Sequence, residues 1–512
     1  MTQRIAIVDL GSNSARLIVT HVYHNGAYNL VYEQKETVRL SRGLTEDGCL
    51  LTEAMDKAIE ALKNFAYMCR LFAADIIIGV ATAAVRNAAN GPAFVEQIRQ
   101  ETGITLRIIS GDEEAWLGYL GVINTIDAPD ALIFDLGGGS TELALVRNRL
   151  VVHTASLPFG AVNTTTLFKT RDRISQTTFT ELTRYIEDQF KSLPWMKNTD
   201  LPLIGIGGTT RNLAKIDQRR KQYPYPKLHN YRMGKMSFED LLNLLLGTNF
   251  SQRKKIPGLN ADRADIMLAG SSIVHALFEA TGSNRLIVSG CGVREGLFMQ
   301  HYLKQCNQPV ILNDILEHST QNMLLFYKAD EQHACHVADI ADLLFAKLEP
   351  FHKLESRERA LLRVAALLHD IGISINYYDH SRHSAYLIEN ARLFGLTHRE
   401  QMLASVIAGW HSGASIKYFR NRIYSEFLDE IDWKNARKMA LMLALAEALD
   451  ETQTSAIQRI DLAISDNKKK ITIFFEADGP CHLEISAAAK RARWFKKEFG
   501  AALEFAPLTT TN

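Results

Sequence analysis

Short apolar runs alternate with amphipathic segments along the first third of the chain. The apolar runs have the length and bounding residues of strands, and the longer segments carry helical periodicity. Alternation of this kind predicts layered α/β structure. The predicted strands are Ile5–Asp9, Leu17–Tyr23, Leu30–Val38, Ile76–Val80 and Thr105–Ile109, and the predicted helices are Thr52–Phe72 and Ala93–Thr102.

The same pattern starts again after a loop at Asp127–Asp130. Strands are predicted at Ala131–Asp135, Glu142–Arg147 and Leu150–Ser156, and a further strand at Leu203–Gly205. The segment from Ile7 to Ser14 reads IVDLGSNS and the segment from Ile133 to Thr141 reads IFDLGGGST. Both are an apolar strand, an aspartate, a leucine, a glycine and small polar residues, which indicates a duplicated half-domain.

From about residue 303 the pattern becomes almost entirely helical, and the last part of the chain returns to strands. Helices are predicted at Leu312–Tyr327, Glu331–Leu348, Ser356–Leu368, His383–Asn390, His398–Gly409 and Trp433–Thr452. The final segments predicted are the strands Ile457–Ile464, Lys470–Phe475 and Cys481–Ile485, the helix Ala487–Phe499 and a polar tail. The fold class predicted is therefore α/β with two duplicated halves at 1–124 and 125–302, an all-α domain at 303–455 and a small α+β domain at 456–512.

Composition and charge narrow the class of protein. The chain has 512 residues, 46% of them hydrophobic and 22% charged, with a formal net charge of +1, so an ordinary globular protein of several domains is expected. A polyanionic substrate would have to be drawn by local positive clusters. One basic stretch, between Lys468 and Lys497, is diluted by acidic residues and is typical of a solvated surface.

Location is indicated by what the sequence lacks. It shows no apolar run of about 18 residues and no signal-peptide core after Met1, and its six cysteines form no CxxC pair. We therefore expect a cytoplasmic protein with reduced thiols and no membrane insertion. Nucleic acid is not expected as a partner.

The paired turns after Asp9 and Asp135 carry the strongest chemical signal. Gly, Ser, Thr and Asn after a strand leave backbone N–H groups unpaired and let an oxyanion approach closely. The aspartates would repel a phosphate, so a hard divalent cation is the natural mediator. The alternative is two tight hairpins with capping aspartates, which the duplication makes less favourable.

Two further glycine-rich loops resemble these turns. The segments Gly205–Arg211 and Val288–Gly296 each follow a short apolar strand and open a helix, which adds an N-terminal dipole to the unpaired N–H groups. Neither matches GxxxxGK[ST] or GxGxxG, so a P-loop or a dinucleotide-binding fold is excluded.

Two polar segments lie between the paired turns. Arg86 stands at the carboxyl end of a predicted strand, where ligands collect in open α/β sheets and a guanidinium suits a phosphate. The segment Ser110–Ala115 also follows a strand and contains Asp112, Glu113 and Glu114. These acids are either favourable first-turn charges of a helix or the carboxylates that orient or deprotonate a water.

These motifs, in this order, closely resemble the exopolyphosphatase and guanosine pentaphosphate phosphatase family over roughly residues 4–300. Pro158–Val162 and Asn260–Asp265 look like further family blocks. The resemblance implies an actin-like ATPase fold, with two ribonuclease-H-like halves hinged around a cleft. It also implies Mg²⁺ (or another divalent cation such as Mn²⁺) and a homodimer.

Site residues follow from the resemblance by position. Glu114, with Glu113 beside it, corresponds to the catalytic base, and Asp135, Glu142 and Asp9 correspond to the metal-associated acids. A larger set is expected to bind phosphate, and its last three residues come from the third glycine loop. The set is Gly11, Ser12, Asn13, Ser14, Arg86, Gly137, Gly138, Gly139, Ser140, Thr141, Gly207, Gly208 and Thr209.

The helical region carries a second constellation. His333 and the pair His369-Asp370 resemble the metal set of HD phosphohydrolases, with Glu447 standing where that set has an aspartate. Three more histidines (His380, His383 and His411) and Asp450 lie nearby in sequence. Imidazole and carboxylate could hold a divalent metal. The alternative, which the resemblance favours, is a vestigial HD fold whose histidines make ordinary hydrogen bonds.

The resulting functional hypothesis is an exopolyphosphatase that removes terminal phosphate from inorganic polyphosphate. The close alternative is hydrolysis of the 5′ γ-phosphate of guanosine pentaphosphate in the same site. A basic channel along the cleft would favour the first, and a guanine pocket the second. More distant alternatives are an actin-like ATPase or kinase and a non-catalytic phosphate-chain sensor.

Overall fold

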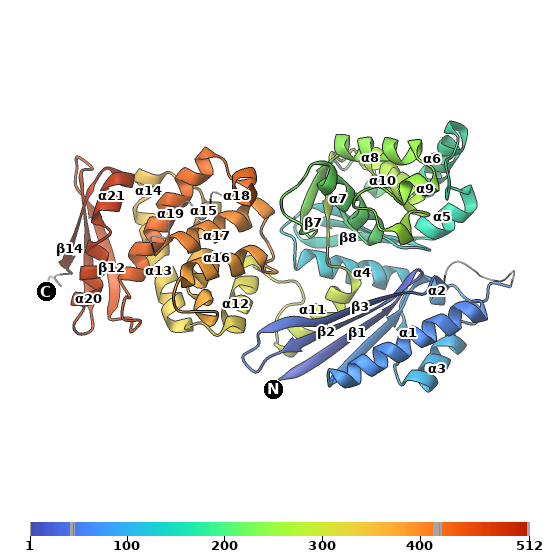
Figure 1. Ribbon diagram of the computed structural model, residues 1–512, viewed down its shortest axis with the longest axis horizontal. Coiled ribbons are helices and arrows are strands. Elements are labelled where there is room, and N and C mark those ends of the chain that lie inside the picture. The colour runs from blue at the N-terminus through green and yellow to red at the C-terminus, as the bar shows by residue number, and fades with distance from the viewer. Residues whose placement is uncertain (1, 41–44, 46, 413–418, 420–421, 509–512) are drawn as a thin grey trace. The chain divides into compact units, whose positions relative to one another are not determined.

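The computed structural model describes residues 2–40, 45, 47–412, 419 and 422–508 (Figure 1). The chain divides into two compact units, Met1–Ile315 and Leu316–Asn512. The first unit contains two sheets and the second contains one, each with its own helices.

The first unit begins with a five-stranded mixed sheet in the order β3-β2-β1-β4-β5. Its first three strands form an antiparallel meander, and β4 and β5 continue the sheet parallel to β1. Helices α1 (Thr52–Leu71) and α3 (Gly91–Thr102) pack on one face through a shared apolar core (Figure 1). The strands are β1 (Gln3–Leu10), β2 (Ser14–Val22), β3 (Tyr28–Thr37), β4 (Ile76–Ala81) and β5 (Leu106–Ile108).

A second sheet repeats this topology. Its order is β10-β11-β9-β6-β7-β8, with β6, β7 and β8 as the antiparallel meander and β9 and β11 continuing parallel to β6. Only the antiparallel edge strand β10 has no counterpart in the first sheet. The duplication predicted from the paired Asp–Gly turns is therefore present in the strand connections. The strands are β6 (Ala131–Leu136), β7 (Thr141–Arg147), β8 (Leu150–Leu157), β9 (Leu203–Ile206), β10 (Tyr231–Gly234) and β11 (Arg285–Val288).

Helices of the second half enclose a large apolar core built on this second sheet. Inward residues such as Phe134, Leu203 and Phe278 are fully buried there. The helices are α5 (Ala161–Phe168), α6 (Gln176–Phe190), α7 (Gly208–Arg220), α8 (Lys235–Gly247), α9 (Phe250–Arg253) and α10 (Met267–Thr281).

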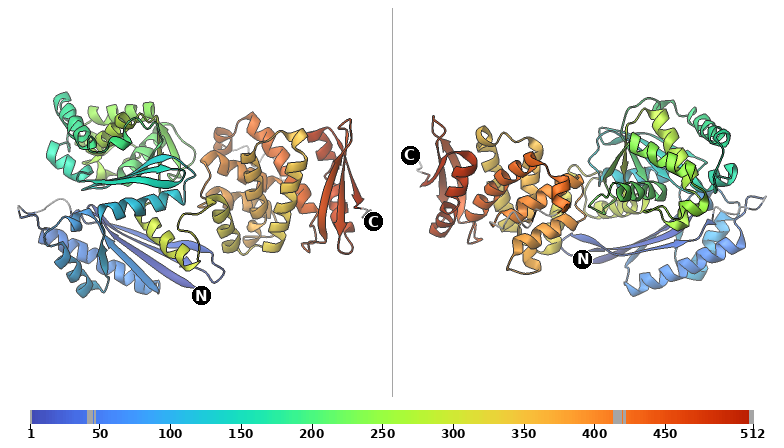
Figure 2. Two further views of the ribbon diagram at one scale, coloured as in Figure 1. Left: turned by 180° about the vertical axis from the view of Figure 1, so that it is seen from behind. Right: turned by 45° about the horizontal axis from the view of Figure 1, so that its top comes forward.

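Two helices of the first unit, α4 (Gly111–Ile123) and α11 (Val293–Gln305), pack against each other at backbone contact (Figure 2). A Cβ on Gly296 would lie 2.0 Å from the carbonyl oxygen of Leu117, and one on Gly121 would lie 2.2 Å from that of Gly292. Neither distance is physically accessible, so the sequence must have glycine at both points of closest approach. Each helix also begins at a segment singled out in the sequence, Ser110–Ala115 and Val288–Gly296.

The second unit is a group of helices followed by a three-stranded sheet in the order β12-β13-β14. Helices α13, α15, α17 and α19 pack around a common apolar interior. The helices are α12 (Ile315–Tyr327), α13 (Glu331–Lys347), α14 (Glu349–His352), α15 (Ser356–Leu368), α16 (His380–Asn390), α17 (His398–Trp410), α18 (Arg422–Phe427), α19 (Glu430–Ala448), α20 (His482–Ala489) and α21 (Ala492–Phe499), and the strands are β12 (Ile457–Ile464), β13 (Lys470–Ala477) and β14 (Ala502–Pro507).

The predicted strand at Cys481–Ile485 is wrong. The alternation of apolar and polar residues there suggested a strand, but the segment opens helix α20, whose last turn is three alanines with high helix propensity. The helix predicted over Ala487–Phe499 is two helices, α20 and α21, interrupted at Lys490-Arg491. The third strand of the sheet is β14, in the segment that the sequence had suggested was a polar tail.

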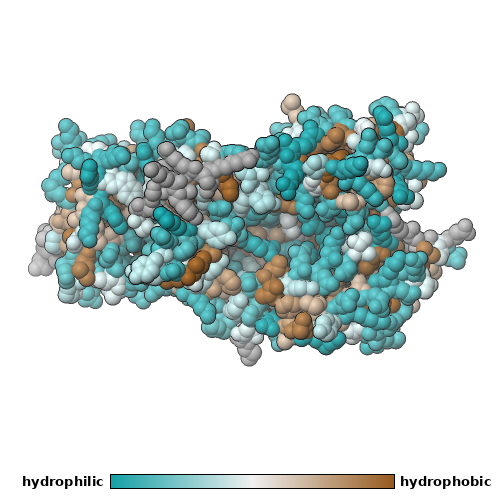
Figure 3. All heavy atoms as spheres, in the orientation of Figure 1, coloured by the Kyte–Doolittle hydropathy of each residue, from teal (hydrophilic) through white to brown (hydrophobic). Residues whose placement is uncertain are grey.

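The face of the molecule drawn in Figure 3 is mostly hydrophilic, with apolar residues scattered over it. Within the described part of the chain, no helix is both long enough and apolar enough to cross a lipid bilayer.

The contact between α4 and α11 predicts the effect of one added methyl group. Gly121→Ala should destabilise the protein by about 1–3 kcal/mol, because the backbones must separate to accept the Cβ. Gly247→Ala, at the end of α8 with no atom within 4 Å of its Cβ, is the matched control and should leave stability unchanged or slightly higher. Thermal unfolding of the full chain measures both, and equal melting temperatures would contradict the close packing.

Candidate active site

The two Asp–Gly turns have the same local structure. In the first, the Gly11 N–H donates to the Ser14 carbonyl at 3.2 Å, and in the second, the Gly137 N–H donates to the Ser140 carbonyl at 3.1 Å. Each turn joins the first two strands of its sheet, β1 to β2 and β6 to β7. The sequence repeat is thus a repeat of backbone geometry.

The turns face each other. A Cβ on Gly138 would lie 3.3 Å from the Cβ of Ser12 and 3.5 Å from the Cβ of Asn13. Among the described residues, the backbone N–H groups of Ser12, Asn13, Gly138 and Gly139 have no acceptor within the chain. Four such groups from two opposed turns are suited to bind the oxygens of one phosphoryl group.

A cleft of about 800 Å³ opens at this meeting point. Its walls come from the two turns, the two later glycine loops and the start of α4. The lining residues are Asp9, Gly11, Ser12, Asn13, Ser14, Arg16, Thr82, Glu114, Asp135, Leu136, Gly137, Gly138, Ser140, Ile206, Gly207, Gly208, Arg211, Arg263, Ser289, Gly290, Cys291, Gly292, Val293, Arg294 and Glu295.

Asp9 and Asp135 lie deep in this cleft at the ends of β1 and β6. Burial raises the pKa of both carboxyls, and for Asp135 it raises the pKa to about 6, partly opposed by Arg16 and reinforced by Asp9. Gly207 adopts a left-handed φ of 99° beside them, and a Cβ there would lie 3.1 Å from Asp135 Oδ1. Two partly buried carboxylates that lack full compensation favour an added cation between them and the substrate.

Glu114 lies in the first turn of α4, which Ser110 caps by accepting the Glu113 N–H at 3.1 Å. The Glu114 side chain is only 8% exposed and accepts a hydrogen bond from Arg86 Nη1 at 2.9 Å. Burial raises the pKa of Glu114 well above its ordinary value, with Glu142 adding to the effect and Arg86 opposing it. A carboxyl with a raised pKa, aimed into a phosphate cleft, is equipped to take a proton from water.

Glu142 lies next to this pair and is not part of the cleft wall. It accepts a hydrogen bond from Ser156 at 3.0 Å and lies 3.8 Å from Arg86 Nη2. Burial raises the pKa of Glu142 to about 7, with the Ser140 hydrogen bond opposing it. Its nearest charged partner is thus the guanidinium that also holds Glu114.

Not every residue of the predicted site lines the cleft. Glu113 turns away to Arg107 at 2.6 Å, and the Thr141 hydroxyl donates to the Phe159 carbonyl at 2.7 Å. Thr209 is fully buried, where its side chain would lie 2.7 Å from a Cβ on Gly270. Besides Glu113 and Glu142, the predicted residues outside the wall are Arg86, Gly139, Thr141 and Thr209.

Four arginines of the cleft, namely Arg16, Arg211, Arg263 and Arg294, were absent from the predicted site. One signal could have found Arg16. It stands seven residues after Asp9, as Glu142 stands seven after Asp135, and the two pairs face each other at equivalent positions in the β1–β2 and β6–β7 ladders. The repeat thus has a basic side chain, Arg16, in one half where it has an acidic side chain, Glu142, in the other.

The other arginines reach the cleft from distant segments. Arg263 lies against Gly208, where a Cβ would be 2.1 Å from the guanidinium, so that glycine is required for the contact. Burial lowers the pKa values of Arg16 and Arg263 to about 10, and both remain charged at neutral pH. The cleft therefore combines buried carboxylates with a positive wall.

The helical unit brings His333, His369 and Asp370 of the second predicted set together, with ligand atoms within 4.8 Å of one another. Glu447 belongs to neither of the two potential metal-ligand groups found among the described residues. Its carboxylate lies 3.9 Å from Arg491, and burial raises the pKa of Glu447 to about 7.

Comparison with known proteins agrees with this geometry. The model of the Ppx/GppA phosphatase family matches residues 17–305, and that of Ppx/GppA phosphatase domain III matches residues 315–484. The chain belongs to the Ppx/GppA phosphatase family. The resemblance inferred from the glycine turns is therefore confirmed, and a Ppx/GppA phosphatase is a hydrolase of phosphoanhydride bonds.

Several relatives cover the chain broadly. A guanosine-5′-triphosphate,3′-diphosphate pyrophosphatase of Pseudoalteromonas atlantica is 27% identical over 97% of this chain and 96% of its own. An exopolyphosphatase structure from Cytophaga hutchinsonii is 25% identical, covers 60% of this chain and 99% of its own, and has a TM-score of 0.56. A Ppx/GppA family structure from Aquifex aeolicus is 27% identical with the same coverages and a TM-score of 0.53.

The position of Glu114 in this Ppx/GppA site predicts its effect on turnover. Glu114→Gln keeps the size of the side chain and an acceptor for Arg86 but cannot take a proton. We expect kcat for phosphate release to fall about 10²–10⁴-fold, with substrate binding retained.

Glu113→Gln is the matched control, because its carboxylate pairs with Arg107 outside the cleft wall. It should change kcat by less than a few-fold. Steady-state release of orthophosphate, with binding measured separately, checks both. Full turnover in Glu114→Gln would remove that residue from the chemistry.

Proposed function

We propose that this chain is an exopolyphosphatase, which hydrolyses the terminal phosphoanhydride bond of inorganic polyphosphate with Mg²⁺ and releases orthophosphate. The observation that carries this choice is a basic extension of the cleft. The extension is suited to the remainder of a phosphate chain whose end lies between the two turns.

The extension is a hollow of about 570 Å³ that shares Arg16, Gly208, Arg211 and Arg263 with the cleft wall. No aromatic side chain of the described residues lines it. Its lining within the described part of the chain is Arg16, Glu33, Lys35, Gly208, Arg211, Asn212, Lys215, Leu228, Asn260 and Arg263. Five cationic side chains against one carboxylate make a surface that binds successive phosphates without reading a base.

The residues of the cleft can divide the reaction between them. The free N–H groups of Ser12, Asn13 and Gly138, which line the cleft, bind the oxygens of the terminal phosphoryl group and hold it in place. Glu114 accepts a proton from a water whose oxygen attacks the phosphorus, while the bond from phosphorus to the bridging oxygen breaks. Arg211 and Arg263 neutralise charge on the departing chain. Positioning and charge neutralisation are the main contributions to phosphoryl transfer.

A divalent cation fits beside Asp9 and Asp135. Mg²⁺ is typically held by one or two carboxylates, substrate phosphates and waters, so two aspartates suffice once the chain is bound. Both carboxyls carry raised pKa values because burial is not fully compensated, which a cation would correct. When bound, the cation neutralises charge on the phosphate oxygens.

A second candidate substrate, guanosine pentaphosphate, is favoured by two observations. The Pseudoalteromonas relative that bears the name of this activity aligns with almost the whole chain. A neighbouring hollow of about 1160 Å³ shares Lys215 and Asn260 with the basic extension and adds Tyr223, Pro224 and Pro226. An aromatic ring and prolines are suited to a nucleobase.

Parallel assays separate the two substrates. Purified protein with Mg²⁺ is given polyphosphates of several lengths and guanosine pentaphosphate, and released orthophosphate is measured. We expect turnover of polyphosphate, with Lys215→Met lowering kcat/KM more for long chains than for triphosphate. Tyr223→Ala should affect only guanosine pentaphosphate. No release from polyphosphate, or faster turnover of guanosine pentaphosphate that Tyr223→Ala suppresses, would overturn the proposed substrate.

Lys35 makes binding in the basic extension sensitive to pH. Lys35 is exposed, but partial desolvation by the hollow, with Arg263 and Arg16 nearby, lowers the pKa of its amine to about 8. A bound phosphate chain favours the protonated amine, so the affinity should fall as pH rises through 8, by up to about tenfold per pH unit above it.

Binding of polyphosphate to the Glu114→Gln protein between pH 7 and 9 measures this dependence without turnover. Lys35→Met should bind more weakly at pH 7 and lose the dependence. Lys57→Met is the control, because Lys57 is an exposed amine paired with Glu53 on α1. This variant should keep the pH dependence of binding. The same pH dependence in Lys35→Met would show that the chain does not enter the extension.

A further inference from the structure

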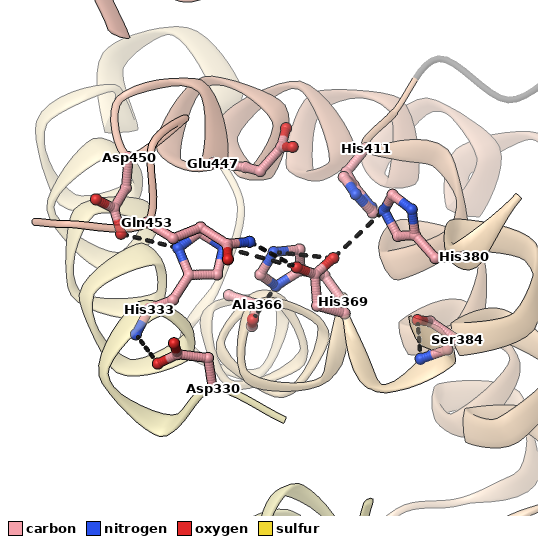
Figure 4. Close-up of polar contacts among 12 residues, drawn as sticks. Asp330, His333, Ala366, His369, His380, Ser384, His411, Glu447, Asp450 and Gln453 are labelled. Atoms are coloured by element: carbon pink, nitrogen blue, oxygen red, sulfur yellow. Dashed lines mark hydrogen bonds and ion pairs between the residues drawn. The ribbon is translucent and has the colours of Figure 1, made fainter. Parts of the chain in front are cut away.

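Four histidines and one aspartate of the second unit converge from separate elements (Figure 4). His333 is on α13, His369 and Asp370 follow α15, His380 begins α16 and His411 follows α17. Their ligand atoms form two groups that share Asp370: His333, His369 and Asp370 in one, and Asp370, His380 and His411 in the other.

The Nδ1 atom of every one of these rings already has an acceptor. Nδ1 of His369, His380 and His411 lies against the backbone carbonyls of Ala366, Tyr377 and Ala408. Because a carbonyl oxygen can only accept, each of these Nδ1 atoms carries the proton of the neutral ring, and each Nε2 carries a lone pair. Nδ1 of His333 lies 2.8 Å from the buried carboxylate of Asp450, which orients that ring in the same way.

The four Nε2 atoms are the opposite case. All four are buried and have no hydrogen-bond partner. An imidazole nitrogen buried without a partner is costly, and four in one place are not expected by chance. Nε2 of His333, His369 and His380 lies 3.3–3.8 Å from the Asp370 carboxylate, and His411 belongs to a group of ligand atoms that includes Asp370.

Distances around Asp370 distinguish hydrogen bonds from coordination. Oδ1 lies 3.3 Å from His380 Nε2 and 3.5 Å from His369 Nε2, and Oδ2 lies 3.8 Å from His333 Nε2. These separations exceed the usual 2.7–3.2 Å of a hydrogen bond. Ligand atoms about 2.1 Å from a shared metal ion lie about 3.0–3.5 Å apart, so each group needs only a small contraction to hold one.

We propose that the second unit binds a pair of divalent first-row transition-metal ions, one in each group, with the Asp370 carboxylate bridging them. Asp450 acts through His333 as a positioning residue, since its other oxygen accepts the Ser455 N–H at 2.7 Å and fixes the carboxylate. Four imidazoles and one carboxylate favour ions such as Zn²⁺, Fe²⁺ or Ni²⁺ over Mg²⁺.

Each ion would have three protein ligands and so keep coordination positions open for water or an oxyanion. Among the described residues of the cluster, the Asp370 side chain is 14% exposed and that of His380 is 22% exposed, so these two ligands are the ones that contact solvent. His369 and His411 are completely buried behind them. This arrangement distinguishes the centre from a closed structural site.

Metal stoichiometry of the full-length protein tests the proposal. The protein is treated with a chelator, incubated with Zn²⁺, Fe²⁺ or Co²⁺ in the presence of excess Mg²⁺, desalted and analysed by mass spectrometry. We expect two ions per chain, a rise in melting temperature and, with Co²⁺, visible absorption bands. Asp135→Asn, in the cleft of the first unit, should leave all three results unchanged.

Four further variants assign the ions to the two groups. Asp370→Ala should lose both ions, His411→Ala should keep one, and His369→Ala should keep one. His383→Ala, one turn along α16 from His380 and in neither group, is the matched control and should keep two. Circular dichroism confirms that each variant is folded.

Two outcomes would overturn the proposal. One is a wild-type protein that retains no more transition metal than Asp370→Ala does. The other is a protein whose ions are lost equally in His383→Ala. A single ion per chain that His411→Ala leaves in place would refute the shared-carboxylate pair.

Discussion

The contact between α4 and α11 is the constraint on which the active site depends. The two backbones meet at Gly121 and Gly296, where no Cβ fits. The first turn of α4 contains Glu114, and the loop before α11 lines the cleft at Ser289–Gly292. Because both ends of this contact contribute to the same cleft, a shift of either helix would move Glu114, the proposed base, relative to the two glycine turns. Glycine at these points thus fixes geometry that catalysis requires to within a fraction of an ångström.

The electrostatics of the cleft follow from the same close packing. Glu114 and Glu142 are buried and Asp9 and Asp135 are partly buried, and desolvation raises the pKa of each. Arg86 and Arg16 offset part of this cost without removing it. In the protein without ligand, the desolvation of these charges is not fully offset, and a bound cation and phosphates would complete their interactions. A pre-organised active site should have this property, at some expense of stability. The positive extension beyond it is suited to a negatively charged ligand.

Features carried by contiguous residues could be predicted from the sequence. The repeat, the two turns and the HD-like pairs are local patterns, and the structure confirms the turns and the repeated topology. Arg211, Arg263 and Lys35 could not be assigned to the site, because their convergence depends on how separate segments fold onto one another. For the same reason His380 and His411 were noticed but not joined to Asp370. The strand prediction for Cys481–Ile485 is wrong for a different reason. Five residues of apolar–polar alternation cannot outweigh the helix propensity of the alanines that follow.

One physical criterion marks both centres, namely buried polar atoms that the protein leaves unsatisfied. In the first unit these are backbone N–H groups, which match phosphate oxygens, and beside them lie carboxylates whose desolvation is not fully compensated, which match a hard cation. In the second unit they are imidazole Nε2 atoms around one carboxylate, which match softer transition metals. Mg²⁺ prefers oxygen ligands, so it would be a poor occupant of the imidazole-rich set. The histidines of the helical unit are held by their Nδ1 atoms in the orientation that coordination requires. Ordinary hydrogen bonding accounts for the Nδ1 atom of each ring but not for its Nε2 atom, which argues against a vestigial fold.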